Sequence, residues 1–391
     1  MIDYNKQSLA DHKKLGGKLE MSCKVEINSK EDLATYYTPG IAAVSKLIAE
    51  KKCKVWEYTS RSNTVAVVTD GSAVLGLGNI GPEAAHPVMA GKAVLFKKFA
   101  GINAFPICLD TQDVDEIVLI CKAIAPSFAG INLEDISAPR CFEIEKRLQN
   151  IGIPVMHDDQ HGTAVVVLAA LINATKVVNK DLRDCKITIS GLGAAGTAIA
   201  LMINKFTENK ATINPVDSSG IVCTNKKANE YKQKVCKSIN YSKIKGALKE
   251  AVKGADIFIG VSAPNLLTEE MVKSMAKDAI VFALANPNPE IDPSVARKAG
   301  AKIVATGRSD FPNQVNNVLA FPGIFKGALE ARATKISEKM KISAALALAA
   351  AVKPTENLIL PDPLDKKVVE KIAKAVKRAA ISEKVVRSRC L

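Results

Sequence analysis

A glycine-rich turn between an apolar run and a helical pattern constrains the fold of this chain more than any other feature. The turn follows a strand expected over Lys186 to Ser190 and opens a helix expected over Ala194 to Met202. Its residues are Gly191, Leu192, Gly193, Ala194, Ala195 and Gly196. In a βαβ unit such glycines let the backbone approach a pyrophosphate, which rests on the positive helix N-terminus. The sequence therefore predicts a doubly wound, Rossmann-type dinucleotide-binding domain.

The residues downstream of this turn continue the pattern of a parallel sheet. Further strands are expected over 212–216, 256–261, 279–284 and 302–305. The first of them ends in Asp217, about 20 residues after the glycines, where an acidic side chain accepts the ribose hydroxyls of a dinucleotide. Asp217 is therefore a candidate for cofactor binding. Asn286 follows a later strand, at the sheet edge where open α/β proteins bind ligands.

Two acidic doublets follow short strands upstream of this domain. Glu134-Asp135 ends a strand at Ile131 to Leu133, and Asp158-Asp159 ends a strand at Pro154 to Met156. Carboxylate oxygens are the hard ligands that Mg²⁺ and Mn²⁺ prefer. Each doublet could instead cap the helix that follows it. We favour a divalent-metal site beside a hydride acceptor, a combination that suits the oxidation of a hydroxy acid.

The region before the doublets predicts a mixed α/β domain. Residues 1–60 are mostly helical in pattern. Two β-rich runs, Thr64 to Val68 and Ala73 to Leu77, flank an Asp-Gly pair and predict a hairpin. A second glycine pattern at Gly76, Gly78 and Gly81 lacks the uninterrupted helix that a pyrophosphate site needs. We interpret it as a tight loop lining the active site.

These elements predict an α/β protein in three parts. Residues 1–160 form a mixed α/β domain for substrate and metal, and residues 161–314 form the Rossmann-type domain for NAD or NADP. Residues 315–391 are expected to be helices that pack back on the first domain.

Composition and charge exclude several other classes of function. The formal net charge is +14, but basic residues are spread along the chain and aromatic residues make up only 5%. Because a nucleic-acid interface interleaves basic and aromatic residues, an anionic substrate and cofactor explain the charge better. The longest apolar run, 342–352, is too short to cross a membrane. The nine cysteines show no metal-type spacing and are expected to be reduced thiols in a cytoplasmic protein.

Seven segments spread over nearly the whole chain match motifs of one enzyme family. They are Tyr37-Thr38-Pro39-Gly40, VTDGSAVLGLGNIGPEAAHPVMAGKAVLFKKFAGI, LEDI around Glu134, HDDQHGT from His157, GLGAAG, ANPNPE around Asn286, and GRSDFPNQVNNVLAFPG to Gly323. With these segments the chain resembles malic enzyme, specifically the short bacterial-type subgroup that some protists share. The resemblance implies divalent-metal-dependent oxidative decarboxylation of L-malate to pyruvate and CO₂ with reduction of NAD or NADP. It also implies a homodimer.

The resemblance implies roles for several side chains. Glu134, Asp135 and Asp159 match the carboxylates that bind Mg²⁺ or Mn²⁺. Lys92 matches the general base that takes the C2 hydroxyl proton, and Tyr37 matches the acid that protonates C3 of enolpyruvate. A lysine base needs a pKa lowered from about 10.4 towards about 7 to 8, and a nearby metal could supply that shift.

Three further matches and one departure concern the surroundings of the substrate. Asp158 matches a neighbour of the lysine, with an orienting or proton-relay role, and Asn286 and Asn317 match residues at the substrate and the nicotinamide ribose. Large animal-type members carry an arginine before the first glycine-rich loop, where this chain reads Ser72-Ala73-Val74. Loop amides near Ser72 or Asn317 are therefore candidates for holding the distal carboxylate.

The choice between NAD and NADP rests on the end of the second nucleotide-binding strand. Asp217 would accept the 2′-hydroxyl of NAD and repel a 2′-phosphate. Ser218 and Ser219 follow it, and Lys226, Lys227 and Lys234 lie nearby in sequence. The family uses this same aspartate with either cofactor, and the sequence favours NADP slightly, with Ser219 facing the 2′ position.

Three other functions stay open at this point. A metal-independent amino-acid dehydrogenase has a similar order of domains but needs no carboxylate cluster. A malolactic enzyme uses related residues to convert malate to lactate without net reduction of cofactor. A non-catalytic nucleotide sensor would need neither Lys92 nor Tyr37, so the presence of both with the acidic doublets argues against it.

Overall fold

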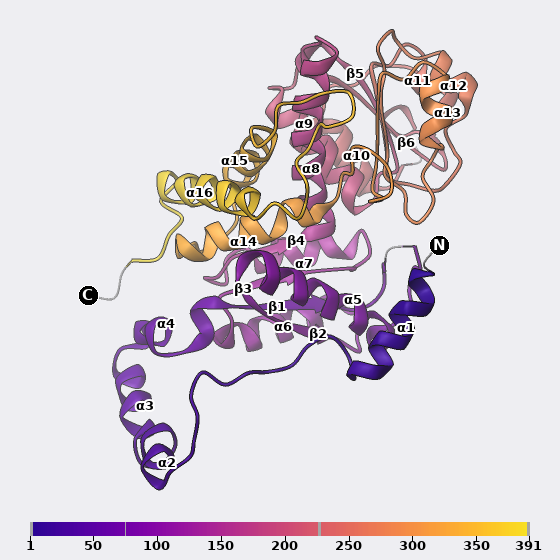
Figure 1. The fold of residues 1–391 in the computed structure, drawn as a ribbon. Coiled ribbons are helices and arrows are strands. Elements are labelled where there is room, and N and C mark those ends of the chain that lie inside the picture. Colours follow the sequence, from indigo (N-terminus) through magenta and orange to yellow (C-terminus); the bar gives the residue numbers. More distant parts are fainter. Residues whose placement is uncertain (1–2, 75, 226–227, 389–391) are drawn as a thin grey trace.

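Two mainly parallel sheets organise the chain, and a long helix, α8 (Asp158–Val177), runs between them (Figure 1). The computed structural model describes residues 3–74, 76–225 and 228–388. The predicted α/β class, with a doubly wound sheet in the second half, is confirmed. None of the helices in the described ranges combines the length and the hydropathy that a membrane span requires.

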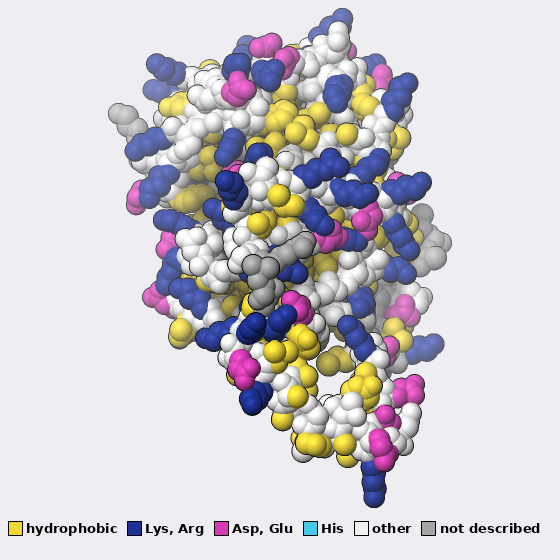
Figure 2. Space-filling view, turned by 90° about the vertical axis from the view of Figure 1, so that its left-hand side faces the viewer, with side chains coloured by type: hydrophobic (Ala, Val, Ile, Leu, Met, Phe, Trp, Pro, Cys, Tyr) yellow, Lys and Arg dark blue, Asp and Glu magenta, His cyan; other side chains and the backbone are white. Residues whose placement is uncertain are grey.

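The N-terminal region is helical and lies open to solvent. Residues 3–63 contain no buried residue, although Leu33, Tyr36 and Ile41 are large and apolar. Its elements are α1 (Tyr4–Leu15), α2 (Lys30–Tyr36), α3 (Ile41–Glu50), η1 (Lys52–Lys54), α4 (Val55–Tyr58) and η2 (Ser60–Asn63). Residues 30–58, here called the arm, project from one end of the molecule (Figure 1). Figure 2 shows apolar side chains gathered along this narrow end.

The first sheet has the strand order β2-β1-β3-β4, and all its strands are parallel. Val65 and Val67 of β1 point into one core and Ala66 and Val68 into another, so both faces of this strand are covered. The elements are β1 (Thr64–Thr69), α5 (Pro82–Leu95), η3 (Phe96–Ala100), β2 (Asn103–Cys108), α6 (Val114–Ile124), η4 (Ala125–Ser127), β3 (Gly130–Leu133), α7 (Arg140–Leu148) and β4 (Val155–His157).

The predicted hairpin at the start of this sheet is wrong. β1 pairs in parallel with β2 and β3, and the described residues of the second run contribute one bridge, between Val74 and Gly78. A strand buried on both faces is apolar throughout, and two such runs beside an Asp-Gly pair look like a hairpin in sequence. The turn after β1 instead leads through the second glycine pattern into α5.

The second sheet has the strand order β10-β9-β8-β5-β6-β7. Its central strand, β5, covers the predicted Lys186–Ser190. Because β6 lies on one side of β5 and β8 on the other, the strand order reverses there, where such sheets bind ligands. The elements are η5 (Leu182–Asp184), β5, α9 (Ala194–Phe206), β6 (Thr212–Asp217), β7 (Gly220–Ile221), η6 (Val222–Thr224), α10 (Glu230–Ser238), α11 (Leu248–Val252), β8 (Ile257–Gly260), α12 (Glu269–Lys273), β9 (Ile280–Ala283), α13 (Pro293–Lys298) and β10 (Ile303–Thr306).

The C-terminal helices contact both halves of the molecule. α15 packs on α8, and α14 packs on α16 and η3. The rings of Phe321 and Phe325 in α14 meet the edge of Phe96, with centroids 4.8 and 5.3 Å away. These elements are η7 (Asn317–Leu319), α14 (Phe321–Glu330), α15 (Glu338–Ala349) and α16 (Lys366–Ser382).

The expectation that all nine cysteines are reduced is wrong. Cys223 and Cys236 form a disulfide, and Cys53 is also disulfide-bonded. The free cysteines of the described residues include Cys121, Cys141 and Cys185, which are buried. The sequence did not predict this disulfide, because a spacing of 13 residues between two cysteines matches no short motif.

Candidate active site

Neighbouring strands bring the two acidic doublets together. β3 and β4 are parallel with Leu133 opposite His157, so Glu134-Asp135 and Asp158-Asp159 follow at one level of the sheet edge. The backbone N–H of Asp135 donates to Asp159 Oδ2 at 2.8 Å and links the doublets directly. Asp135 has a φ of 54°, which turns the chain sharply after β3.

Three of these carboxylates fit a divalent cation. Each of the three residues Glu134, Asp135 and Asp159 offers one carboxylate oxygen, and these three oxygens lie within 4.8 Å of one another. Burial raises the pKa of all three, and the negative charges of their neighbours in the cluster raise it further. Asp135 Oδ2 is buried without a hydrogen-bond partner among the described residues. These three carboxylates offer only oxygen ligands and repel one another, and one of their oxygens has no partner. A bound Mg²⁺ or Mn²⁺ would neutralise the repulsion and coordinate these oxygens.

Lys92 enters this cluster from α5. Its Nζ lies 2.7 Å from Asp158 Oδ2 and 2.8 Å from Glu134 Oε1, and it stands over the ring of Phe321 at 4.3 Å. Burial alone would lower the pKa of Lys92, but the carboxylates of Asp158, Glu134 and Asp159 raise it above its ordinary value. The lowered pKa that a base requires is therefore not produced by the protein alone, and it requires a positive charge among these carboxylates.

Asp158 connects the lysine to the C-terminal part of the chain. Its Oδ2 also accepts a hydrogen bond from Asn317 Nδ2 at 2.7 Å, so η7 is held against the first turn of α8. Gly162 leaves room for this carboxyl group, because a Cβ there would lie 1.8 Å from Asp158 Oδ1. Burial raises the pKa of Asp158, and Lys92 acts in the opposite direction.

A cavity of about 480 Å³ joins this cluster to the second sheet. Asp159 and Gly76 line it from the first half, and Ala195, Asn286 and Asn317 line it from the second. The interpretation of the second glycine pattern as a lining loop therefore agrees with the position of Gly76. Asn286 lies three residues after the end of β9 and precedes a cis peptide bond to Pro287.

The glycine turn has the geometry of a pyrophosphate cradle. A Cβ at Gly196 would lie 1.8 Å from Gly191 O, and Gly191 itself has a φ of 98°. A Cβ at Gly193 would meet no protein atom within 4 Å, so the backbone is open there. Leu192 is buried, and α9 begins at Ala194 and directs its N-terminus at the turn.

The end of β6 carries a charged pair that the sequence did not predict. Asp217 Oδ2 lies 2.5 Å from Lys232 Nζ on α10, and Asp217 Oδ1 accepts from the N–H and hydroxyl of Ser219. Ser218 is exposed beside them. Lys234 pairs with Glu230 instead, and Lys226 and Lys227 lie outside the described residues.

Of the three predicted catalytic residues, Tyr37 is the one that the chain does not bring to the cluster. It caps α2 in the arm, is 65% exposed, and lies at the far end of the molecule from α5 and β4 (Figure 1). The motif that identified Tyr37 carries no information about where the arm lies.

Three side chains around the site escaped the sequence analysis. Asn132 Nδ2 donates to Glu134 Oε2 at 2.7 Å, and a polar residue inside an apolar strand was a signal that could have found it. Phe321 and Lys232 carried no such signal. Ser72, a candidate for the distal carboxylate, donates its hydroxyl to Asp70 and accepts from the N–H of Ser137, so its side chain is engaged within the protein.

Comparison with known proteins agrees with this geometry. Residues 16–149 match the family model of the malic enzyme N-terminal domain, and residues 160–381 match that of the malic enzyme NAD-binding domain. An NAD-dependent malic enzyme of Geobacillus stearothermophilus is 53% identical over 378 residues, 95% of this chain and 78% of that protein. A bifunctional malic/malolactic enzyme of Bacillus subtilis is 53% identical over 392 residues, 99% of this chain and 95% of that protein.

Solved structures give the same answer. The crystal structure of an NAD-dependent malic enzyme from Thermotoga maritima superposes with a TM-score of 0.92 at 49% identity, over 96% of this chain and 99% of that one. The two matched ranges together include every strand of both sheets except β4, and most of the helix between the sheets. The chain therefore belongs to the malic enzyme family.

Proposed function

We propose that the chain catalyses the divalent-metal-dependent oxidative decarboxylation of L-malate to pyruvate and CO₂, with reduction of NAD or NADP. The observation that carries the proposal is the cavity that Asp159 and Ala195 both line. A carboxylate cluster and a dinucleotide turn that open on one cavity bring a substrate hydroxyl and a hydride acceptor within reach of each other.

The roles of the individual residues are part of the proposal. Glu134, Asp135 and Asp159 hold Mg²⁺ or Mn²⁺, which when bound supplies Lewis acidity to the substrate oxygens. Lys92 takes the proton of the C2 hydroxyl, and Asp158, which accepts from its ammonium group, orients it.

The amides and the glycine turn complete the assignment. Asn317 holds Asp158 and faces the cavity, where it and Asn286 contact the substrate and the nicotinamide ribose. The turn from Gly191 to Gly196 binds the pyrophosphate, and Asp217 with Ser218 and Ser219 surrounds the adenosine ribose.

The direct test uses purified protein with L-malate, Mn²⁺ and either NAD or NADP. The expected result is formation of reduced cofactor and pyruvate in equal amounts, lost on addition of EDTA. Asp159→Asn serves as the control, because it keeps the size of the side chain and removes the charge of one ligand. Reduction of neither cofactor would contradict the proposal.

We further propose a homodimer in which the arm of one copy completes the site of the other. Leu33, Tyr36 and Ile41 are each about half exposed. Tyr37 belongs to the same arm, whose helices α2 and α3 lie apart from α5, the helix that carries Lys92 (Figure 1). A second copy with the same exposed surface would cover these apolar side chains symmetrically. Tyr37 would then act as the acid at the partner's carboxylate cluster.

Mixing two inactive variants tests this arrangement. Tyr37→Phe and Lys92→Ala are each expected to lose turnover. In an equal mixture of exchanged subunits, half the dimers are mixed and one of their two sites is intact, which restores about a quarter of wild-type activity. Mixed dimers that stay inactive would place Tyr37 and Lys92 of each site on one chain.

The preference for NADP stays a proposal that the charged pair at β6 supports. Lys232 compensates the charge of Asp217 and stands where a 2′-phosphate could pair with it. The relatives from Geobacillus and Thermotoga are named NAD-dependent, which favours the other cofactor. The ratio of kcat/KM for NADP to kcat/KM for NAD measures the preference. Ser219→Asp is expected to lower this ratio by a factor of about 5 to 150.

A malolactic reaction is the second candidate, because the Bacillus relative is named a bifunctional malic/malolactic enzyme. It would produce lactate from malate without net reduction of cofactor. Measuring lactate beside the nicotinamide absorbance in the same assay separates the two reactions.

The division into residues 1–160, 161–314 and 315–391 and the cytoplasmic location are also proposals. Separate sheets before and after α8 support the first boundary. In the cytoplasm disulfides are mostly transient or redox-sensing, so the bond between Cys223 and Cys236 needs an explanation of its own.

A further inference from the structure

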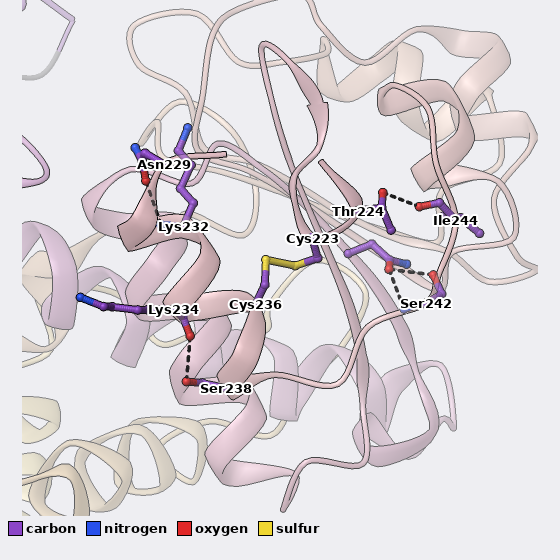
Figure 3. The surroundings of a disulfide bond; sticks show 10 residues. Cys223, Thr224, Asn229, Lys232, Lys234, Cys236, Ser238, Ser242 and Ile244 are labelled. Atoms are coloured by element: carbon purple, nitrogen blue, oxygen red, sulfur yellow. Dashed lines mark hydrogen bonds between the residues drawn. A yellow bond between two sulfur atoms is a disulfide. The ribbon is translucent and has the colours of Figure 1, made fainter. Parts of the chain in front are cut away.

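The disulfide connects two segments that flank the charged pair at β6. Cys223 lies in η6 and Cys236 in α10, with their Cα atoms 5.3 Å apart (Figure 3). Cys236 is buried at 7% exposure, whereas Cys223 is half-buried and therefore more open to a reagent from solvent. Of the two sulfur atoms, that of Cys223 is the one that an external thiol would attack.

The helix that this bond holds also supplies the cation of the pair. Lys232 lies four residues before Cys236 on α10, one helical turn away, and its Nζ contacts Asp217 Oδ2 at 2.5 Å. In Figure 3 the bond links the side of α10 to the neighbouring loop. Fixing Cys236 therefore fixes the part of the helix from which Lys232 reaches Asp217.

The loop that the bond holds reaches the same carboxylate through one intervening side chain, that of Ser219. Asn225, two residues after Cys223, donates through Nδ2 to Ser219 Oγ at 3.0 Å. The hydroxyl of Ser219 in turn donates to Asp217 Oδ1. The disulfide thus joins α10, which contacts Asp217 through Lys232, to the loop that reaches Asp217 through Ser219.

Breaking the bond would leave α10 anchored elsewhere. Tyr231 stacks on Phe142 with ring centroids 4.1 Å apart, and Val235 is buried. Reduction therefore removes one tether without removing the packing of the helix, and the separation between η6 and α10 becomes free to change.

We propose that Cys223 and Cys236 are a thiol–disulfide exchange site that controls how the adenosine end of NAD(P) is bound. The inference rests on the proposed position of the cofactor at β6. The oxidised form holds Lys232 against Asp217, which compensates the negative charge beside a 2′-phosphate. In the reduced form this compensation weakens, so NADP binding suffers more than NAD binding.

The reagent for this exchange is a dithiol, a small molecule or a protein with two neighbouring cysteines. Its thiolate attacks the sulfur of Cys223, the bond between Cys223 and Cys236 breaks, and Cys236 leaves as a thiolate that takes a proton. The second thiol of the reagent then displaces Cys223 and closes its own disulfide. One protein disulfide and one dithiol become two protein thiols and one reagent disulfide, with two electrons and two protons transferred to the protein.

The test measures the dissociation constants of NADP and NAD without malate, for protein kept oxidised and for protein reduced with dithiothreitol. Reduction is expected to raise the dissociation constant of NADP at least about threefold and to raise the dissociation constant of NAD by a smaller factor. Cys236→Ser should behave like the reduced form under both conditions. Cys53→Ser is the matched control, because it removes the other disulfide-bonded cysteine described and should keep the response.

The outcomes separate this inference from the proposed function. Equal dissociation constants in the two redox states, or a response that persists in Cys236→Ser, would overturn the exchange site while leaving the enzyme assignment intact. Absence of cofactor binding in both states would instead contradict the proposed function and, with it, this inference. If Cys236→Ser does not fold, the fraction of reduced Cys223 and Cys236 can be measured by mass spectrometry in a series of glutathione redox buffers. The dissociation constant of NADP must then change at the potential at which this pair is reduced, and a change at another potential would overturn the inference.

Discussion

The Oδ2 atom of Asp158 lies 2.7 Å from Nζ of Lys92, and the two side chains come from elements 66 residues apart in sequence. Neither is exposed by more than a tenth of its surface. A buried ion pair of this kind is costly to break, because the remaining charge is left without its partner. The pair therefore fixes the position of α5 relative to the start of α8.

Replacing Asp158 by asparagine should separate orientation from binding. Lys92 keeps Glu134 as a partner at 2.8 Å, so the variant should fold, but its ammonium loses the carboxylate that aligns it. We expect kcat to fall by about 10²-fold to 10⁴-fold while the dissociation constant of NAD(P) stays within about twofold. Steady-state kinetics and a direct binding titration check this. A cofactor constant that changes as much as kcat would assign Asp158 to the nucleotide site instead.

Metal binding should be visible without turnover. Since the carboxylates of Glu134, Asp135 and Asp159 repel one another, Mn²⁺ at about 100 times its Kd should stabilise the fold by about 2.7 kcal/mol. In Asp159→Ala the same addition should leave the melting temperature nearly unchanged, because the oxygen shell is incomplete. Differential scanning calorimetry with and without Mn²⁺ measures both. Equal stabilisation of the two proteins would move the metal site elsewhere.

Two phenylalanines of α14 offer a matched comparison. Phe321 and Phe325 both pack on Phe96, but Phe321 also lies under Nζ of Lys92. Replacing either by leucine should cost about 1 to 1.5 kcal/mol of stability. Turnover should fall only in Phe321→Leu, because that variant alone removes the ring that contacts the lysine. A similar fall in kcat for Phe325→Leu would show that packing, and not the ring beneath Lys92, sets the rate.

Two glycines of the nucleotide turn should respond differently to alanine. Gly196→Ala places a methyl group 1.8 Å from Gly191 O, so the turn itself must shift and the protein should lose stability. Gly193→Ala meets no protein atom within 4 Å, so its melting temperature should stay unchanged while the Kd for NAD(P) rises at least about tenfold. Thermal unfolding and cofactor titration distinguish the two effects. Normal cofactor binding by Gly193→Ala would exclude a pyrophosphate at this position.

Acid stability should depend on Glu145. Burial opposes ionisation of this side chain, but His161 and Lys341 hold its pKa at about 2. With an unfolded-state pKa of about 4.3, the carboxylate contributes about 3 kcal/mol, complete above about pH 5 and lost as the pH falls through about 2. Glu145→Gln should therefore lose stability most at pH 7, with a deficit that shrinks from pH 5 to pH 3. Urea unfolding at several pH values tests this, and a deficit independent of pH would mean that packing alone is responsible.

The parts of the site that could be predicted were those encoded by local pattern. The glycine turn and the doublets follow short strands, so their position at a sheet edge comes from the rule for parallel strands, and the structure places them there. The hairpin failed because an apolar run does not reveal whether its partner strand is local or distant. β1 pairs with residues about 40 and 65 positions later in the chain, which no short-range signal specifies.

Long-range geometry accounts for the other failures. Lys232 reaches Asp217 because α10 packs beside η6 and α9, and a lysine among many lysines does not reveal this contact in the sequence. The sequence motif identified Tyr37 as a residue type but could not locate the arm that carries it. Cysteine pairing likewise depends on two segments meeting in space.

The helix α8 presents its first two residues, Asp158 and Asp159, at the proposed chemistry and buries most of the rest. Its first residue, Asp158, holds the lysine, while the apolar body from Ala164 to Ala174 packs on α9 and α15. Protein interiors are dense and barely compressible, so a shift imposed on this body is carried to its first turn. Turnover in this enzyme is therefore open to adjustment by substitutions in α9 and α15 that touch neither metal nor substrate. Substitutions that accumulate in the deepest part of the core would therefore change the turnover rate.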